Sequence, residues 1–324
     1  MRRIERKFSI LLLAFTSILL LIIPLLIFFT PNQVSEFYYR ELTYKHISAT
    51  TTENSQNDLT SLIALFNYVK ENQNVDPAYK AVDKTAYNNL VMGVSWCDQQ
   101  AFTLATLLNK CRINSRLRDV QGHTALEVYI DDEWKLIDPF FGQLFYRKSD
   151  GQLATLDDVV KEQGKNLTVN KFDIILPYME DAVENLVPSS LYVPSETRWS
   201  NGIGPEFSKA FKESNIKNII TKIADFSYDI LGYNYACLFQ EHYLKYAQVI
   251  DMGPEVVIDY NDLYTKNDES FKHYFNARNY QLFGQNEKAQ KEYQILVSLF
   301  PDSFWAKRVD GSELIAEMQV DQTY

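Results

Sequence analysis

Residues 96–101 read WCDQQA, and residues 122–139 read GHTALEVYIDDEWKLIDP. The first stretch places Cys97 where an irregular segment meets a run with helical spacing. The second stretch has the alternation of two strands, joined at Asp131-Asp132, a pair typical of a tight turn. A helix followed by a small antiparallel sheet predicts an α+β fold.

The turn decides which side chains of the predicted hairpin face one another. With Asp131 and Asp132 as the two loop residues, Ala125 pairs with Asp138, and His123 is the diagonal neighbour of Asp138 on the same face. We therefore expect an imidazole and a carboxylate to meet at this end of the sheet. A single bulge in either strand would reverse the parity and separate them.

Cys97, His123 and Asp138 are the candidate catalytic residues. A helix start favours the thiolate form of a cysteine, a histidine can activate the sulfur, and an acid can fix the tautomer of the histidine. Each residue also has a purely structural interpretation, because a single cysteine is often a buried apolar group and Asp-Pro often ends a strand. Their spacing alone leaves both interpretations open.

Residues 97–142 resemble the core of the transglutaminase-like superfamily. The resemblance is carried by Cys97 at a helix start, the segment from Arg112 to Arg116, and the run from His123 to Asp138-Pro139. It implies a papain-like core with Cys97 as nucleophile, His123 as general base and acid, and Asp138 as the residue that orients the imidazole. It also implies attack on an amide carbonyl through a thioester, which water or an amine then resolves.

The implied chemistry needs hydrogen-bond donors for the oxyanion. The backbone N–H of Cys97 is the first candidate, because it lies at a helix start. Some members of the family add an upstream side chain, and Tyr87, Asn88, Asn89 and Trp96 are the candidates for that role. The sequence does not rank these four residues.

The other cysteines and histidines of the chain give no sign of a metal or cofactor site. Cys111 and Cys237 are expected to be buried free thiols, and the chain has only three cysteines. His46, His242 and His273 are scattered, with no cysteine or carboxylate set at ligand spacing around them. We therefore predict that the protein uses no metal and no cofactor.

Residues 8–29 carry no charge and follow a start with four basic residues, Arg2, Arg3, Arg6 and Lys7. As a helix they span about 33 Å, enough for a hydrocarbon core of about 30 Å. A cleaved signal peptide is the alternative, but the apolar run is too long and no small-x-small site follows it. The pattern predicts a single-pass membrane anchor with a cytoplasmic N-terminus and an extracytoplasmic C-terminal domain.

Composition and spacing divide the rest of the chain into further regions. The expected regions are a transmembrane anchor over 1–30, a juxtamembrane stalk over 31–57, a transglutaminase-like domain over 58–164, an irregular linker or flap over 165–205, and an α-helical region over 206–324. Residues 270–303 of the last region are spaced like one tetratricopeptide repeat, a helical hairpin. This hairpin is either a cap on the molecule or a site for a protein partner.

Two hypotheses about function follow from these features. The first is a membrane-anchored cysteine enzyme, either a peptidase/amidase or an acyltransferase. It would act on peptide bonds or glutamine side-chain amides of a peptide or protein outside the cytoplasm. The second is a catalytically weak or inactive scaffold that uses the same fold and its helical tail to bind a partner. The formal charge of −10 argues against a nucleic-acid partner, which requires a basic surface.

Overall fold

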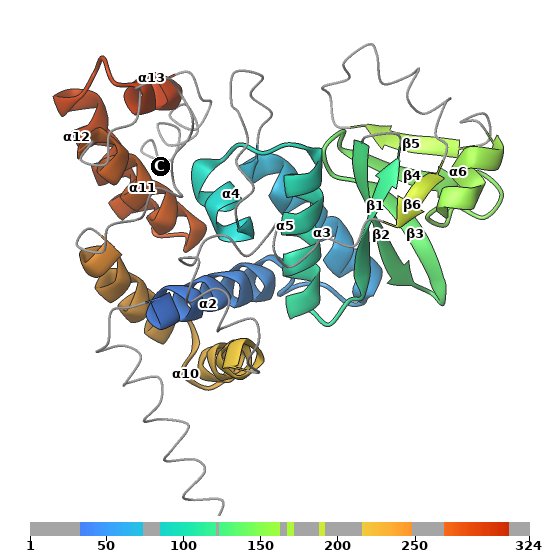
Figure 1. Ribbon diagram of the computed structural model, residues 1–324, viewed down its shortest axis with the longest axis horizontal. Coiled ribbons are helices and arrows are strands. Elements are labelled where there is room, and N and C mark those ends of the chain that lie inside the picture. Colours follow the sequence, from blue (N-terminus) through green and yellow to red (C-terminus); the bar gives the residue numbers. More distant parts are fainter. Residues whose placement is uncertain are drawn as a thin grey trace, which may run out of the picture. The chain divides into compact units, whose positions relative to one another are not determined.

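The computed structural model describes residues 33–73, 85–120, 123–162, 167–171, 188–191, 216–247 and 269–310. Helices and one antiparallel sheet make up these residues, so the predicted α+β class is confirmed at that level (Figure 1). The contacts divide the chain into two compact units. One unit is Met1–His46 with Ile203–Val256, and the other is Ile47–Gly202 with Val257–Tyr324.

The sheet belongs to the second unit and has the strand order β5-β4-β3-β2-β1-β6. The central strands are β1 (Ser115–Val120), β2 (His123–Ile130), β3 (Glu133–Asp138) and β4 (Gln143–Arg147), and the edge strands are β5 (Leu167–Lys171) and β6 (Pro188–Leu191). Asp131 and Asp132 have φ values of 53° and 62°, as a two-residue type I′ turn requires. Ile130 pairs with Glu133. The predicted turn and register are therefore confirmed.

Helix α5 (Cys97–Lys110) contacts β1 and β2, and α3 (Asp58–Asn72) and α4 (Ala86–Met92) pack against α5. The predicted start of a helix at Cys97 is confirmed. Helix α3 buries Leu62, Leu65, Phe66 and Val69. The N-cap of α3 is Asn57, whose side chain accepts a hydrogen bond from the Thr60 N–H.

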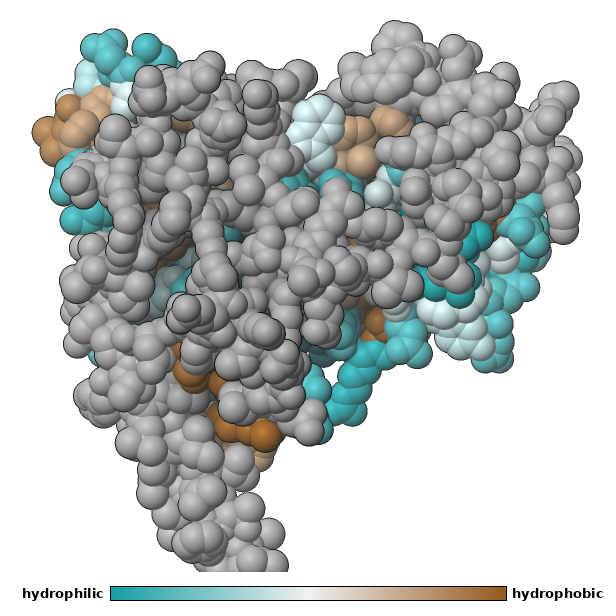
Figure 2. Space-filling model, viewed as in Figure 1, coloured by the Kyte–Doolittle hydropathy of each residue, from teal (hydrophilic) through white to brown (hydrophobic). Residues whose placement is uncertain are grey.

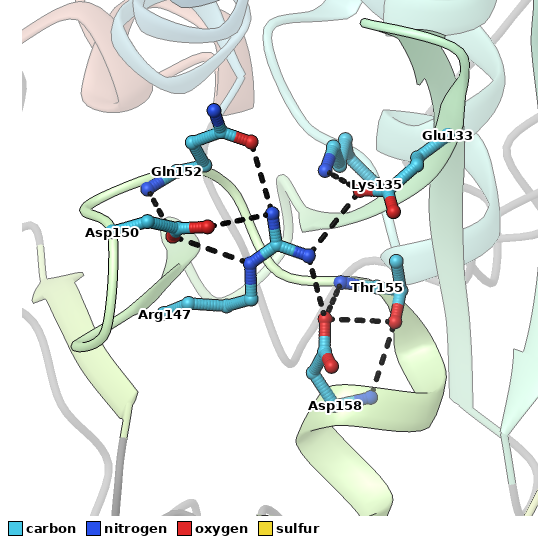
Figure 3. A network of polar contacts seen from close by, with 7 residues as sticks. All are labelled: Glu133, Lys135, Arg147, Asp150, Gln152, Thr155 and Asp158. Atoms are coloured by element: carbon cyan, nitrogen blue, oxygen red, sulfur yellow. Dashed lines mark hydrogen bonds and ion pairs between the residues drawn. The ribbon is translucent and has the colours of Figure 1, made fainter.

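A charged network joins the end of β4 to the start of α6 (Leu156–Glu162), as Figure 3 shows. The Arg147 guanidinium lies 3.3 Å from Glu133, 3.0 Å from Asp150 and 3.6 Å from Asp158. The Asp158 carboxylate also accepts hydrogen bonds of 2.9 Å from the N–H and the hydroxyl of Thr155. Exposed ion pairs of this kind contribute little stability individually, so the network chiefly holds the connection between β4 and α6 in place.

The C-terminal part of the chain contains the predicted helical hairpin. Helices α11 (Glu269–Leu282) and α12 (Asn286–Leu299) form it, and α13 (Phe304–Asp310) follows. Gly284 lies between the two helices with φ 66°, and Ala277 and Ala289 are fully buried, which lets the helices approach closely.

Helix α11 is fixed to α4 by a buried arginine. The Arg278 guanidinium donates hydrogen bonds to the backbone carbonyls of Leu90, Val91 and Asn72, at 2.8 Å, 3.1 Å and 3.3 Å. The Tyr274 hydroxyl donates to the Met92 carbonyl at 2.9 Å. These carbonyls end α3 and α4, where helices lack internal donors. The hairpin is thus part of the unit that contains the sheet.

The expected stalk contains a long helix instead. Helix α2 (Gln33–Thr51) buries aromatic side chains against α10 (Ile216–Ala247), with Tyr39 and Tyr243 stacked at 4.2 Å. The Tyr38 and Tyr235 hydroxyls are hydrogen-bonded at 2.9 Å. The polar composition of residues 31–57 concealed this helix, because its tyrosines combine a buried ring with a polar hydroxyl. Helix α10 therefore belongs with α2 rather than with the C-terminal hairpin.

No helix in the described part of the chain is long and apolar enough to cross a membrane. The predicted anchor over residues 1–30, including the apolar run 8–29, lies outside the described residues. Most of the predicted linker or flap over residues 165–205 lies outside them as well.

Replacing Gly93 by Ala should destabilise the protein more than replacing Gly151 by Ala. Both glycines have positive φ, 65° and 70°, so both substitutions carry a backbone cost of about 1–2 kcal/mol. At Gly93 the added Cβ would also lie 3.2 Å from the Arg278 Nη2, whereas at Gly151 it meets nothing within 4 Å. Chemical denaturation of the two variants measures the difference. Equal losses would show that Arg278 can move aside freely.

Candidate active site

The segment before Cys97 is held by a chain of buried side chains. The Ser95 hydroxyl donates to Gln73 Oε1 at 3.0 Å, and Gln73 Nε2 donates to the Thr103 hydroxyl at 3.2 Å. The Thr103 hydroxyl donates in turn to the Gln99 carbonyl at 2.9 Å. Because all four side chains are buried, this chain fixes the start of α5 to the end of α3.

Cys97 is the first residue of α5. The preceding residue, Trp96, has extended backbone and caps the helix, and its N–H donates to Gln99 Oε1 at 2.9 Å. The first-turn N–H groups of a helix have no acceptor within the helix. Cys97 therefore combines a thiol with a backbone donor at the positive end of the helix dipole.

His123 and Asp138 meet as the hairpin register predicts. His123 Nε2 and Asp138 Oδ2 are 2.6 Å apart, a short distance typical of a charge-assisted hydrogen bond. The other carboxylate oxygen, Asp138 Oδ1, accepts the Phe141 N–H at 3.1 Å. Asp138 is buried, and these two bonds fix its orientation.

Cys97 lies against the same imidazole. Burial alone lowers the pKa of His123, but the Asp138 carboxylate, together with a hydrogen bond and a charge interaction from Cys97, raises this pKa from 6.5 to about 10. The imidazole is therefore protonated at neutral pH. Its Nε2 is engaged by Asp138, which leaves Nδ1 as the ring nitrogen available to the sulfur. The structure thus brings the three predicted site residues together.

Lys70 is a neighbour of this site that the sequence did not indicate. Its ammonium on α3 donates to the Phe140 carbonyl at 3.1 Å. Burial lowers the pKa of Lys70, and the nearby Asp138 carboxylate offsets part of that shift. Lys70 therefore holds the turn after β3 and supplies a positive charge close to Asp138. No sequence pattern relates residue 70 to residue 138, so this contact exists only in the fold.

Aromatic rings surround the imidazole. The Phe141 and Phe140 rings lie 4.7 Å and 5.8 Å from the His123 ring. The Trp96 ring lies 6.4 Å from the Phe140 ring, at an interplanar angle of 13°. The two phenylalanines directly follow Asp138-Pro139 in the sequence, and that position could have identified them as part of the site.

The structure distinguishes two of the candidates for a second oxyanion donor. The Tyr87 hydroxyl already donates to Asn279 Oδ1 at 2.6 Å. Asn89 is buried, and within the described residues its Nδ2 has no hydrogen-bond acceptor. The Tyr87 hydroxyl is thus engaged elsewhere, whereas the buried Asn89 amide has an unsatisfied donor among the described residues.

The other two cysteines differ slightly from the expectation. Neither Cys111 nor Cys237 forms a disulfide among the described residues, but both are half-buried rather than fully buried. Among the described residues, no group of three or more His, Cys, Asp or Glu side chains is placed to hold a metal ion.

Comparisons with known proteins identify no relative. No family model matches the chain, and neither a curated protein nor a solved structure matches it. The interpretation of the site therefore depends on its own geometry and on the sequence resemblance described above.

The pair of His123 and Asp138 should make the stability of the fold depend on pH. The pKa of His123 is about 10 in the folded state, against an ordinary value of 6.5, so the folded state binds this proton more tightly. The resulting stabilisation is complete below pH 6.5 and is lost as the pH rises through about 10.

Urea unfolding of the wild-type chain and of the His123→Gln variant tests this dependence. The difference in unfolding free energy between the two proteins should be largest near pH 6.5 and should shrink as the pH rises to about 10. Asp138→Asn should flatten the same dependence, because it removes the main group that raises the pKa. A difference that grows with pH would contradict the assignment.

Proposed function

We propose that this chain is a cysteine enzyme of transglutaminase-like type, which acts on amide bonds through a thioester intermediate. The observation that carries the proposal is the convergence of Cys97 and Asp138 on the two sides of the His123 imidazole. Along the chain, a helix that begins at Cys97 is followed by a strand and then by the hairpin. The sequence resemblance implies the same order.

The first half-reaction uses the protonated state of His123. The Cys97 thiolate attacks the carbonyl carbon of the amide, and the imidazolium donates its Nδ1 proton to the leaving nitrogen. The C–N bond breaks, the amine departs, and the acyl group remains on Cys97 as a thioester. Asp138 keeps Nε2 protonated and holds the ring in the orientation that presents Nδ1 to the sulfur.

The second half-reaction regenerates the thiolate. Neutral His123 takes a proton from water or from an amine, which attacks the thioester and releases an acid or a new amide. The oxyanion of each tetrahedral intermediate accepts a hydrogen bond from the Cys97 N–H. Hydrolysis and transamidation use the same residues, so the product depends on whether water or an amine reaches the thioester.

The scaffold hypothesis does not explain why Cys97, His123 and Asp138 lie together. A protein that only binds a partner has no need of a cysteine, a histidine and an acid in hydrogen-bonding order. The Arg278, Tyr274 and Asn279 side chains of α11 are engaged with α4 and its neighbours, which accounts for much of the hairpin without a second protein.

Cys97 should react with iodoacetamide faster than Cys111 and Cys237. At about pH 6 an ordinary thiol is almost wholly protonated, whereas a thiolate paired with an imidazolium stays reactive. We expect an advantage of roughly tenfold or more for Cys97, measured by peptide mapping of the alkylated full chain. His123→Ala should remove most of this advantage, because it deletes the cation. Equal rates for the three thiols would support the scaffold hypothesis.

We further propose that residues 8–29 anchor the enzyme in a membrane, with the catalytic unit outside the cytoplasm. The uncharged run and the basic residues before it support this topology. A reporter that is active only outside the cytoplasm should show activity when it is fused after Tyr324. Protease added to spheroplasts should digest the catalytic unit. A protected C-terminus, or a mature N-terminus after residue 30, would contradict the anchor.

A further inference from the structure

Three aromatic side chains form a wall beside Cys97 and His123, which we call the aromatic wall: Trp96, Phe140 and Phe141. Trp96 directly precedes the candidate nucleophile, and this residue is 37% exposed. Phe140 lies next, at 6.4 Å from the Trp96 ring and 5.0 Å from the Phe141 ring. Both phenylalanine rings contact the imidazole, so the wall extends from one reacting group to the other.

The wall is held in place by its backbone. The Phe140 carbonyl accepts a hydrogen bond from Lys70, and the Phe141 N–H donates to the Asp138 carboxylate. The Trp96 N–H is bonded to the Gln99 side chain. Each aromatic residue is thus tied to an element of the catalytic unit, and a preorganised surface loses little entropy when it binds a ligand.

The chemistry of the wall is apolar. Residues 139–142 read PFFG, so the turn carries no charged or hydrogen-bonding side chain. Figure 2 shows a small brown and pale patch at the upper centre, near the upper end of α5 in Figure 1. Protonated His123 beside the rings disfavours a cationic side chain that would otherwise bind an aromatic face.

We propose that the aromatic wall is the subsite for an apolar, preferably aromatic, side chain of the substrate residue that supplies the acyl group. This inference rests on the proposed function, because it assigns the substrate class of that same site. The acyl carbon must come within bonding distance of Cys97, which places the side chain of that residue next to Trp96 and Phe140. The ring faces then bind it through apolar burial and stacking.

A set of peptidyl acyloxymethyl ketones that differ only in the side chain beside the reactive ketone tests the subsite. The side chains are those of Ala, Phe, Glu and Lys, and the measurement is the second-order rate of Cys97 modification in the full chain. The Phe probe should react roughly tenfold or more faster than the Ala probe, as one apolar subsite can provide. The Glu and Lys probes should react no faster than the Ala probe.

Trp96→Ala should bring the ratio of the Phe rate to the Ala rate close to one. Phe140→Leu keeps the apolar bulk but removes the ring, so it should lower the ratio less than Trp96→Ala does. This milder variant also tests the subsite if Trp96→Ala fails to fold. Tyr129→Ala is the matched control, because Tyr129 is also a 38% exposed aromatic residue but lies at the turn end of β2, away from His123. It should leave the ratio unchanged.

The outcomes separate the subsite from the proposed function. If all four probes modify Cys97 at one rate, or the Glu or Lys probe is fastest, the function stands and the subsite is overturned. If no probe modifies Cys97 faster than Cys111, the proposed function fails and the subsite fails with it. A Phe preference that survives both Trp96→Ala and Phe140→Leu would place the apolar subsite elsewhere.

Discussion

The hydrogen bond between His123 and Asp138 is the interaction on which the site depends. Its existence is set by a two-residue turn, because Asp131 and Asp132 adopt positive φ values and thereby fix the register of β2 against β3. A shift of one residue would turn every side chain of one strand to the other face and separate the two groups. The catalytic chemistry proposed here therefore begins with the backbone conformation of two aspartates at the far end of the hairpin.

The position of Cys97 depends on a second set of constraints, which are buried and polar. Gln73 and Thr103 hold the Ser95 side chain and the first turn of α5, while Arg278 binds the carbonyls at the end of α4. A buried guanidinium is costly unless its donors are satisfied, and here backbone carbonyls and Gln281 satisfy them. The C-terminal hairpin is therefore structurally joined to the segment that carries the candidate nucleophile, Cys97.

Much of this site could be predicted from local sequence. The helix start at Cys97 and the pairing across Asp131-Asp132 depend on residues that are close in the chain, and periodicity and turn chemistry report such relations directly. Lys70 and Arg278 could not be found in this way, because their partners are 70 and 188 residues distant and are partly backbone carbonyls, which carry no residue signature.

The helix in the expected stalk could not be predicted from the sequence, for a different reason. Residues 31–57 look polar because tyrosine, threonine and serine are frequent there, yet α2 buries its tyrosines against the tyrosine-rich α10. A side chain that is both aromatic and polar does not reveal from sequence alone whether it is buried. The division of the helical region into α10 with α2, and α11 with α4, likewise depends on contacts between distant residues.

Trapping an acyl group on the protein tests the proposed thioester chemistry most directly. The full chain is mixed with a peptidyl ester of a good leaving group, quenched in acid, and mapped by mass spectrometry. The account predicts one acyl adduct on Cys97 that hydroxylamine removes, as expected of a thioester, and that accumulates less when His123 is replaced by Ala. Acylation spread equally over Cys97, Cys111 and Cys237, or no adduct on Cys97, would contradict it.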